Sequence, residues 1–586
     1  MSAKDHPAGE TESTDEAFAR GISRRKFILG SAAAGAAIGL GGPAGAAAAG
    51  GSDRPATPHT TDPSDEELIL HNGKIRTMDD GDRVVPALAI RSGRFVEVGN
   101  FGRRGRNAVD LKGRVVIPGL IESCDHIVSF GNYRPGYHTV LENATSIAEI
   151  QTILAARRAD VPAGEWITSL GAWTAETMFA EHRLPNRAEL DAAVPDHPVL
   201  LYQTTVGPAS VNSLGKAYFE SASTPIVVSP DGTIASGIQS TTALYLLRQT
   251  QTLEQRRRCT QEAWAYCASV GLTSHIDQQG IASPPSPQYA LGNAILTEPS
   301  LNPNQTLFHF DHFRHYDTWS GLHREGRTTV RMQADFVIDA LDVLNERIKN
   351  QLPFFGDDMM STHAVHFQPA GGVSNPIWLE GYRLMARFGW RGRSGGGTVA
   401  NMEAAITGWE QLATEYDITD LRWTLHRMSG TTHAQLDRLK ALGGTVNVVS
   451  RSYPLAASAA PAAPFRTVVD NGIHAGIHMD GGHIATLNPW ITIYFAVTGR
   501  NGLGELVNPG QQITRQEALR LFTRANAYQM RMEDKLGSIE VGKLADLVVL
   551  DKDYLAVTDE DLKKIRSVLT IVDGKVIHNS GALKVP

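Results

Sequence analysis

Short apolar runs alternate with amphipathic helical runs from about residue 116 to residue 530, and this alternation limits the chain to few folds. Strands that are separated by helices pair in parallel, and eight such units close into a barrel with its functional groups at the carboxyl ends of the strands. Candidate strands cover residues 271–277, 329–333, 364–368, 421–426, 444–449 and 474–480. The pattern therefore predicts an α/β fold, a (β/α)₈ TIM-type barrel, with a further buried strand at 199–202 in an inserted subdomain.

Both ends of the chain carry strand and turn patterns outside the alternating region. Residues 68–78 contain two apolar runs that are separated by an Asn-Gly pair, and residues 568–577 contain a similar pair of runs around Asp-Gly. Such dipeptides are typical of two-residue hairpin turns. We therefore expect short antiparallel strands at both ends.

The first 49 residues have the features of a targeting segment. Arg24 and Arg25 stand shortly before Phe27, and an Ala- and Gly-rich apolar run with small-residue cleavage candidates follows from residue 30 to residue 49. These features predict a twin-arginine signal peptide over 1–49. A membrane anchor is the alternative, which the low hydrophobicity of the run disfavours. Residues 50–65, rich in Pro, Thr, Ser and Asp, predict a disordered linker. We expect an exported protein, secreted or in the periplasm or cell envelope, without a stable membrane anchor.

Composition narrows the class of protein. The chain has 586 residues, of which 42% are hydrophobic and 20% charged, as expected of a soluble enzyme with a large domain and a satellite. A formal net charge of −7 without a basic stripe argues against nucleic-acid binding. Three cysteines cannot build a disulfide framework. We expect the partner to be a small-molecule substrate.

One segment, residues 116–126, ends in residue types that bind metal ions. An apolar run, a Pro-Gly break and a second short strand end in the polar cluster that contains Cys124 and His126. Side chains at positions i and i+2 of a strand point to the same face, so both can bind one metal ion. The alternative is that Cys124 is a small packing residue.

This segment resembles the first barrel strand of the amidohydrolase superfamily, which has the pattern Pro-Gly-hydrophobic-Ile-Asp-x-His-x-His, with Cys124 in place of the first histidine. Residues 537–551 resemble a specific C-terminal signature of the same superfamily. The resemblance runs over nearly all of 66–582 and is closest to the YtcJ-like subgroup, which includes N-substituted formamide deformylases. It implies a barrel over 116–530 and a small β-sandwich domain formed by both chain ends, 66–115 and 531–586. Members of the family often form dimers, so a homodimer is an expectation.

The resemblance also implies which residues form the site. It places Cys124 and His126 on strand 1, His366 on strand 4, His426 on strand 6 and Asp480 on strand 8. His366 stands where relatives carry an acidic or lysine side chain, and Gly395 stands where strand 5 carries a histidine. Because these departures remove bridging anionic ligands, we expect one divalent metal ion, Zn²⁺, bound by Cys124, His126, His426 and His366.

In this reading the metal activates a water molecule, and Asp480 is the catalytic general base and acid in hydrolysis of a C–N bond, an amide or an N-formyl group. Asp480 could instead cap a loop, and His426 could be a buried histidine bonded to a backbone carbonyl. Trp173, in a Gly-x-Trp element, and His478, on the strand face of Asp480, are candidates for substrate binding. The alternative for His478 is a residue of a second barrel layer.

Two other functions stay open. The altered site also suits a lyase, isomerase or cyclase with little or no metal, in which Cys124 could act as a nucleophile paired with a histidine. A degenerate, non-catalytic binding protein is the third possibility. His363 and His366 are three residues apart, so regular strand alternation predicts that only one of them faces the site.

Overall fold

The structure is a computed structural model that describes residues 67–102, 107–127, 136–170, 173–203, 207–222, 226–278, 316–455, 462–481 and 485–586. The predicted signal peptide and linker lie outside these ranges. Within them, every helix is too short or too polar to cross a membrane.

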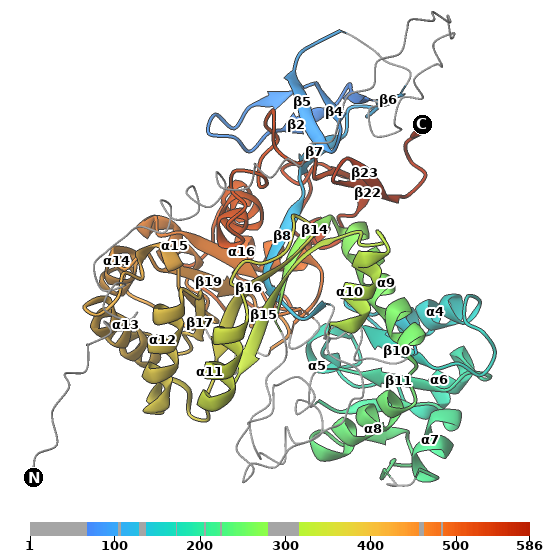
Figure 1. The fold of residues 1–586 in the computed structure, drawn as a ribbon. Helices are drawn as coiled ribbons and strands as arrows, with labels where there is room; N and C mark the ends of the chain where they lie inside the picture. The colour runs from blue at the N-terminus through green and yellow to red at the C-terminus, as the bar shows by residue number, and fades with distance from the viewer. Residues whose placement is uncertain are drawn as a thin grey trace, which may run out of the picture. The chain divides into compact units, whose positions relative to one another are not determined.

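Eight parallel strands form the sheet that carries the candidate site, in the order β20-β19-β18-β17-β16-β15-β14-β8 (Figure 1). Their bounds are β8 Leu120–Asp125, β14 Leu272–Gln278, β15 Arg331–Ile338, β16 Met360–Phe367, β17 Gly392–Gly395, β18 Thr424–His426, β19 Thr445–Val449 and β20 Ala475–His478. This arrangement confirms the predicted α/β barrel class.

Side chains close the seam between β8 and β20, the two ends of this sheet order. Ser123 Oγ donates to the carbonyl of Ile477 at 3.0 Å, and Asn526 Nδ2 donates to the same carbonyl at 2.8 Å. The backbone N–H of Met479 donates to the Glu122 carboxylate at 2.9 Å. Buried backbone groups need partners, and here polar side chains supply them where strand pairing does not.

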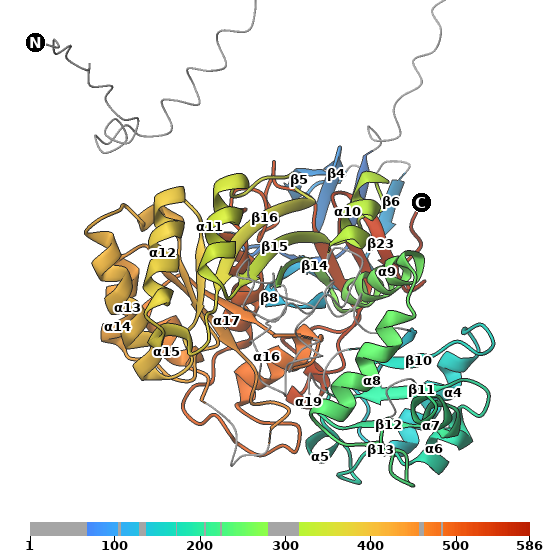
Figure 2. The same ribbon diagram turned by 60° about the horizontal axis from the view of Figure 1, so that its bottom comes forward.

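Helices cover the outside of the barrel strands, as Figure 2 shows for α11 to α15. Their bounds are α9 Leu253–Val270, α10 Asp317–Arg324, α11 Leu341–Asn350, α12 Ile377–Phe388, α13 Val399–Ala413, α14 His433–Ala441, α15 Phe465–Asn471, α16 Pro489–Thr498, α17 Arg515–Arg520 and α18 Asn526–Gln529. Local sequence explains the ends of α9. Thr252 and Gln255 form a capping box at its start, and Gly271 ends it with a left-handed φ of 90°.

A second, five-stranded sheet lies in the segment between β8 and β14, in the order β13-β12-β11-β10-β9. Its strands are β9 Tyr137–Val140, β10 Ile167–Leu170, β11 Val199–Tyr202, β12 Ala209–Val211 and β13 Thr233–Ile234, and its helices are α4 Ile147–Arg158, α5 Ala175–Met178, α6 Arg187–Ala193, α7 Ser213–Glu220 and α8 Ile238–Gln249. All four residues of β11 are buried, which confirms the strand predicted at 199–202 in an inserted segment.

The two ends of the chain build two further sheets, ordered β5-β4-β1-β6 and β23-β22-β21-β7-β2-β3. The strands are β1 Leu68–His71, β2 Lys74–Arg76, β3 Val84–Val85, β4 Ala87–Arg91, β5 Arg94–Gly99, β6 Asn107–Asp110, β7 Val115–Pro118, β21 Leu547–Leu550, β22 Ser567–Val572 and β23 Lys575–Asn579, with helix α19 Asp559–Leu562. β21 pairs antiparallel with β7, so N- and C-terminal segments share one sheet. The two sheets share an apolar core that includes Leu88 and Val549. The boundaries at 66–115, 116–530 and 531–586 stay predictions.

Candidate active site

Alternate strands of the barrel supply one layer of polar side chains. Gln278, His366, His426 and His478 end β14, β16, β18 and β20 or lie one residue before the end, as expected of an inward-facing layer in such a barrel. The ring centroids of His366 and His426 are 4.7 Å apart, and those of His426 and His478 are 5.9 Å apart. The side-chain amide of Gln278 contacts His366 Nδ1. Sequence elements more than 80 residues apart are thus brought to one centre.

A bulge explains why His363 and His366 both make contacts inside the barrel. The register between β15 and β16 shifts between Ala334 and Asp335, where β16 advances by one extra residue at His363. His363 Nδ1 lies 2.6 Å from Asp335 Oδ1, while His366 contacts Gln278 in the layer above. The bulge interrupts regular strand alternation, so both side chains make contacts inside the barrel, but only His366 lies in the layer with His426.

A second group of charges lies next to the layer. Arg393 donates to Asp335 Oδ2 at 2.6 Å and to the carbonyl of Ser123 at 2.9 Å. Burial opposes ionisation of Asp335, but Arg393 and His363 hold the pKa of its carboxyl below the usual range. Asp335 is therefore a buried carboxylate with two stabilising partners.

Three side chains converge at the carboxyl ends of strands β8, β18 and β20. Arg427 Nη2 forms an ion pair with Asp480 Oδ1 and lies 3.3 Å from His126 Nε2. His126 Nε2 is 3.2 Å from the same Asp480 oxygen, and His126 Nδ1 is 2.6 Å from the carbonyl of Gln278. We call Arg427, His126 and Asp480 the mouth triad.

The backbone at the mouth triad has unusual geometry. Arg427 has φ = 57° and Asp480 has φ = 60°, both in the left-handed region that residues other than glycine seldom occupy. Such conformations are retained where the surrounding structure over-determines them, often at functional sites. His126 and Asp480 were predicted to join the site, whereas Arg427 was not. Its position directly after the strand residue His426 is the signal that could have identified it.

Cys124 lies within the histidine layer. Its Sγ is 3.3 Å from Gln278 Oε1 and 3.7 Å from His426 Nδ1. Burial raises the pKa of the Cys124 thiol above its ordinary value. Burial also lowers the pKa of both His366 and His478 to about 3, and it lowers the pKa of His426 well below the usual value. The layer is therefore electrically neutral at pH 7: a thiol beside neutral imidazoles.

The predicted metal ligands can be tested against this geometry. Thiol and neutral imidazole are donor types that suit Zn²⁺, and His426 Nε2 is buried without a hydrogen-bond partner among the described residues. His126, however, contacts Asp480 and Arg427, while His366 contacts Gln278 and, through Nε2, Gln368 at 2.7 Å. In the described ranges, three metal-ligating atoms lie within 4.8 Å of one another only at a different group. Cys124, His126, His366 and His426 do not form one coordination shell here, so their role as ligands stays a prediction.

Gly395 and the two predicted substrate-binding residues differ in their surroundings. Among the described residues, a Cβ atom at Gly395 would meet only Gln368 Oε1, at 3.9 Å, so this position is open rather than packed. His478 Nδ1 lies 3.2 Å from the carbonyl of Cys124, within the layer. Trp173 instead belongs to the apolar core of the inserted segment and stacks on Phe179 with ring centroids 5.3 Å apart. Its role in substrate binding stays a prediction that its packing does not favour.

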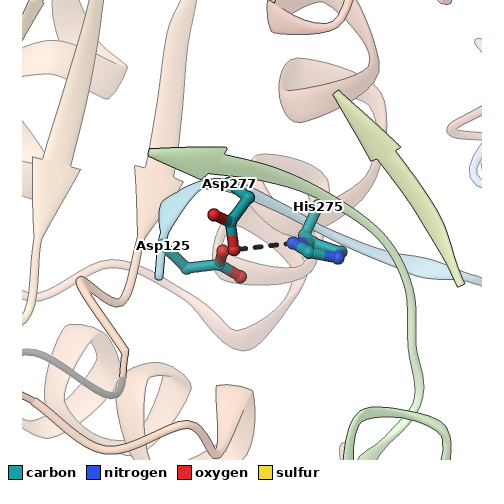
Figure 3. Close-up of side chains that lie close together, drawn as sticks. All are labelled: Asp125, His275 and Asp277. Carbon is teal, nitrogen blue, oxygen red and sulfur yellow. Dashed lines mark hydrogen bonds and ion pairs between the residues drawn. The ribbon is translucent and has the colours of Figure 1, made fainter. Parts of the chain in front are cut away.

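The group that does gather three ligating atoms consists of Asp125, His275 and Asp277 (Figure 3). His275 Nδ1 lies 3.1 Å from Asp125 Oδ1, and all three residues are fully buried. The sequence pattern did not single out this group, because its members come from strands 150 residues apart.

Known proteins resemble this chain over most of its length. It is 23% identical to the N-substituted formamide deformylase of Arthrobacter pascens over 558 residues, which cover 87% of this chain and 97% of that protein. It is also 23% identical to the putative amidohydrolase YtcJ of Bacillus subtilis (strain 168) over 562 residues, covering 87% and 99% of the two chains.

Solved structures share the fold. An uncharacterized metal-dependent hydrolase from Pyrococcus horikoshii matches with a TM-score of 0.54 at 18% identity, covering 84% of this chain and 99% of that one. A similar protein from Pyrococcus furiosus matches with a TM-score of 0.52 at 20% identity, covering 83% and 100%. The model of the amidohydrolase family matches residues 107–295 and 393–578, more than half of the chain. The chain therefore belongs to the amidohydrolase family.

Proposed function

We propose that this chain is an enzyme that hydrolyses a C–N bond of a small molecule, an amide or an N-formyl group, at the carboxyl ends of its barrel strands. The observation that carries the proposal is the mouth triad, in which a buried carboxylate, an imidazole and a guanidinium meet where barrel enzymes place their reacting groups. Family membership and the resemblance to a formamide deformylase along nearly its whole length support this class of reaction.

The mouth triad has the groups that amide hydrolysis requires. Asp480 is a hydrogen-bond acceptor that can take a proton from the attacking water and return it to the leaving nitrogen. Arg427 places a positive charge beside that carboxylate, where it can also stabilise negative charge that develops on the carbonyl oxygen. His126 contacts both groups, and its bond to the Gln278 carbonyl holds its ring in place.

A divalent metal ion in the barrel interior stays a prediction from the resemblance, and no step above depends on it. Export through the twin-arginine pathway is likewise part of the proposal, and it rests on Arg24 and Arg25 with the apolar run that follows them. Replacing both arginines by lysine should retain the protein in the cytoplasm, and fractionation of cells that express the full chain would test this. A homodimer remains an expectation for size-exclusion chromatography.

The activity is tested with purified protein and a panel of N-substituted formamides and simple amides. We expect Asp480→Asn to lower kcat/KM by about 10²–10⁴-fold, because it removes the proton-transfer group. Asp534→Asn is the matched control, since Asp534 is exposed and outside the site. No turnover across the panel by the wild-type protein, or full activity of Asp480→Asn, would contradict the proposal.

The Cys124–His426 contact is the one observation that favours a different reaction, a covalent mechanism with a thiol nucleophile. Nucleophilic thiols are usually deprotonated near neutral pH, whereas burial raises the pKa of Cys124. Hydrolysis at the mouth triad is therefore the better-supported function.

A further inference from the structure

Asp125, His275 and Asp277 lie on the opposite face of the barrel wall from the candidate active site. Asp125 stands between Cys124 and His126 on β8, and Asp277 immediately precedes Gln278 on β14. Successive side chains of a strand point to opposite faces, so the neighbours that face the barrel interior direct these residues outward. The hydroxyl of Tyr316, which stands just before α10, donates to Asp277 Oδ1 at 3.1 Å from this outer side.

Strand register brings the two carboxylates together. Asp125 and Asp277 are directly opposite each other in the parallel pairing of β8 and β14, after a register shift in β8. Figure 3 shows their carboxyl groups side by side, with the His275 ring next to them. The ligating atoms of the three residues lie within 4.8 Å of one another. This spacing is short enough for one ion to contact all three.

Two atoms of the group have no partner in the part of the chain that the structure describes. Asp125 Oδ2 and His275 Nε2 are buried without a hydrogen-bond partner among the described residues. A buried carboxylate oxygen without a partner carries a large desolvation cost unless a cation or a proton binds there.

We infer that Asp125, His275 and Asp277 bind a divalent transition-metal ion at a site separate from the predicted metal position in the barrel interior. Two carboxylate oxygens and one imidazole nitrogen suit Zn²⁺, Mn²⁺ or Fe²⁺, and the nitrogen donor makes Mg²⁺ and Ca²⁺ less suitable. The ion neutralises the two carboxylates and joins the carboxyl ends of β8 and β14. Through those strand ends it positions Cys124, His126 and Gln278 on the other face.

The test is the metal content of the purified full-length protein and its variants after dialysis against Zn²⁺ or Mn²⁺ and then against metal-free buffer. We expect about one equivalent in the wild type and at least about a tenfold lower content in Asp125→Asn and His275→Gln, because each removes a ligand. His426→Gln, which changes the barrel interior, is the matched control and should retain the metal. Metal that persists in Asp125→Asn but is lost from His426→Gln would overturn the inference, as would metal-free wild-type protein.

A second measurement uses only the wild-type protein, so it tests the inference even if the variants fail to fold. Cobalt substitution of the wild-type protein should give a spectrum without the thiolate-to-cobalt charge-transfer band that binding by Cys124 would produce. A strong band of that kind in protein that holds only one equivalent of cobalt would overturn the inference. A chelator should also lower the Tm of the wild type, because the ion binds only the folded state. These results do not depend on turnover, so a failed activity assay and a failed metal site are distinguishable.

Discussion

Replacement of Arg427 by methionine is the perturbation that most directly tests the reading of the mouth triad. The Asp480 side chain is fully buried, and the Arg427 side chain is 13% exposed, so the ion pair is largely removed from water. Methionine keeps much of the side-chain volume and removes the charge. Breaking a buried pair by removing one partner costs about 3–5 kcal/mol, because the remaining charge is left uncompensated. Because the Arg427 side chain is partly exposed, we expect a value at the low end of this range, a fall of about 3 kcal/mol in the free energy of unfolding.

The double variant Arg427→Met/Asp480→Asn shows whether the ion pair causes this loss. Removing both charges takes away the uncompensated carboxylate, so the double variant should be more stable than the sum of the single effects by at least about 1 kcal/mol. Urea unfolding, followed by circular dichroism on all four proteins, measures this coupling. Additive losses would contradict the prediction, since they would mean that Arg427 and Asp480 do not interact in solution.

The same variant has a kinetic consequence. If Arg427 stabilises charge on the carbonyl oxygen, Arg427→Met should lower kcat by about 10²–10³-fold on the best substrate. Arg427→Lys restores the charge but not the planar group that reaches both His126 and Asp480, so we expect only partial recovery. A kcat that is unchanged in Arg427→Met would leave the guanidinium with a structural role alone.

Further predictions concern the surroundings of the site. Gly395→His should fold and raise the affinity of the interior for Zn²⁺, because its Cβ would meet a single described atom at 3.9 Å; isothermal titration with the metal checks this. Cys124 should resist iodoacetamide in the folded protein, as burial raises its pKa, and rapid modification with loss of activity would support a thiol nucleophile. Arg331→Met should destabilise the chain by about 3–5 kcal/mol, since it breaks the buried ion pair with Asp546 at 2.8 Å and leaves that carboxylate without its charged partner. Burial lowers the pKa of His363 to about 4, whereas the value in the unfolded chain is near 6.5. The stability that depends on neutral His363 is therefore fully present above pH 6.5. It falls by about 1.4 kcal/mol per pH unit as the pH decreases from 6.5 toward 4. His363→Gln should show a shallower pH dependence of unfolding over that window, and an unchanged slope would contradict the assignment.

Local sequence determined the barrel class because the relevant signals are short-range. The apolar runs that predicted strands at 271–277, 444–449 and 474–480 coincide closely with β14, β19 and β20. Prediction was weaker where a strand lacks an apolar run. β17 consists of Gly392–Gly395, and its buried side chains include Arg393. Its place in the sheet depends on neighbours across the barrel rather than on its own residues.

Local sequence patterns predicted only some of the residues in the candidate site. His126, His426 and Asp480 were identified by their positions at strand ends, and all three lie in or beside the layer at the carboxyl ends of the strands. Arg427 was missed, because a charged residue after a strand is more often solvated than paired inside a barrel. Only the folded chain shows that its guanidinium contacts both His126 and Asp480.

The amino-acid sequence alone determined the alternation of strands and helices, the family and the residues at the ends of strands β8, β18 and β20. Tertiary structure decided which of those residues meet. A bulge at His363 and a register shift in β8 change which way nearby side chains point. Regular strand alternation, read from the sequence, does not predict these directions. Register is a property of two paired strands, so Asp125 and Asp277, although each is visible in the sequence, became one group only when β8 paired with β14.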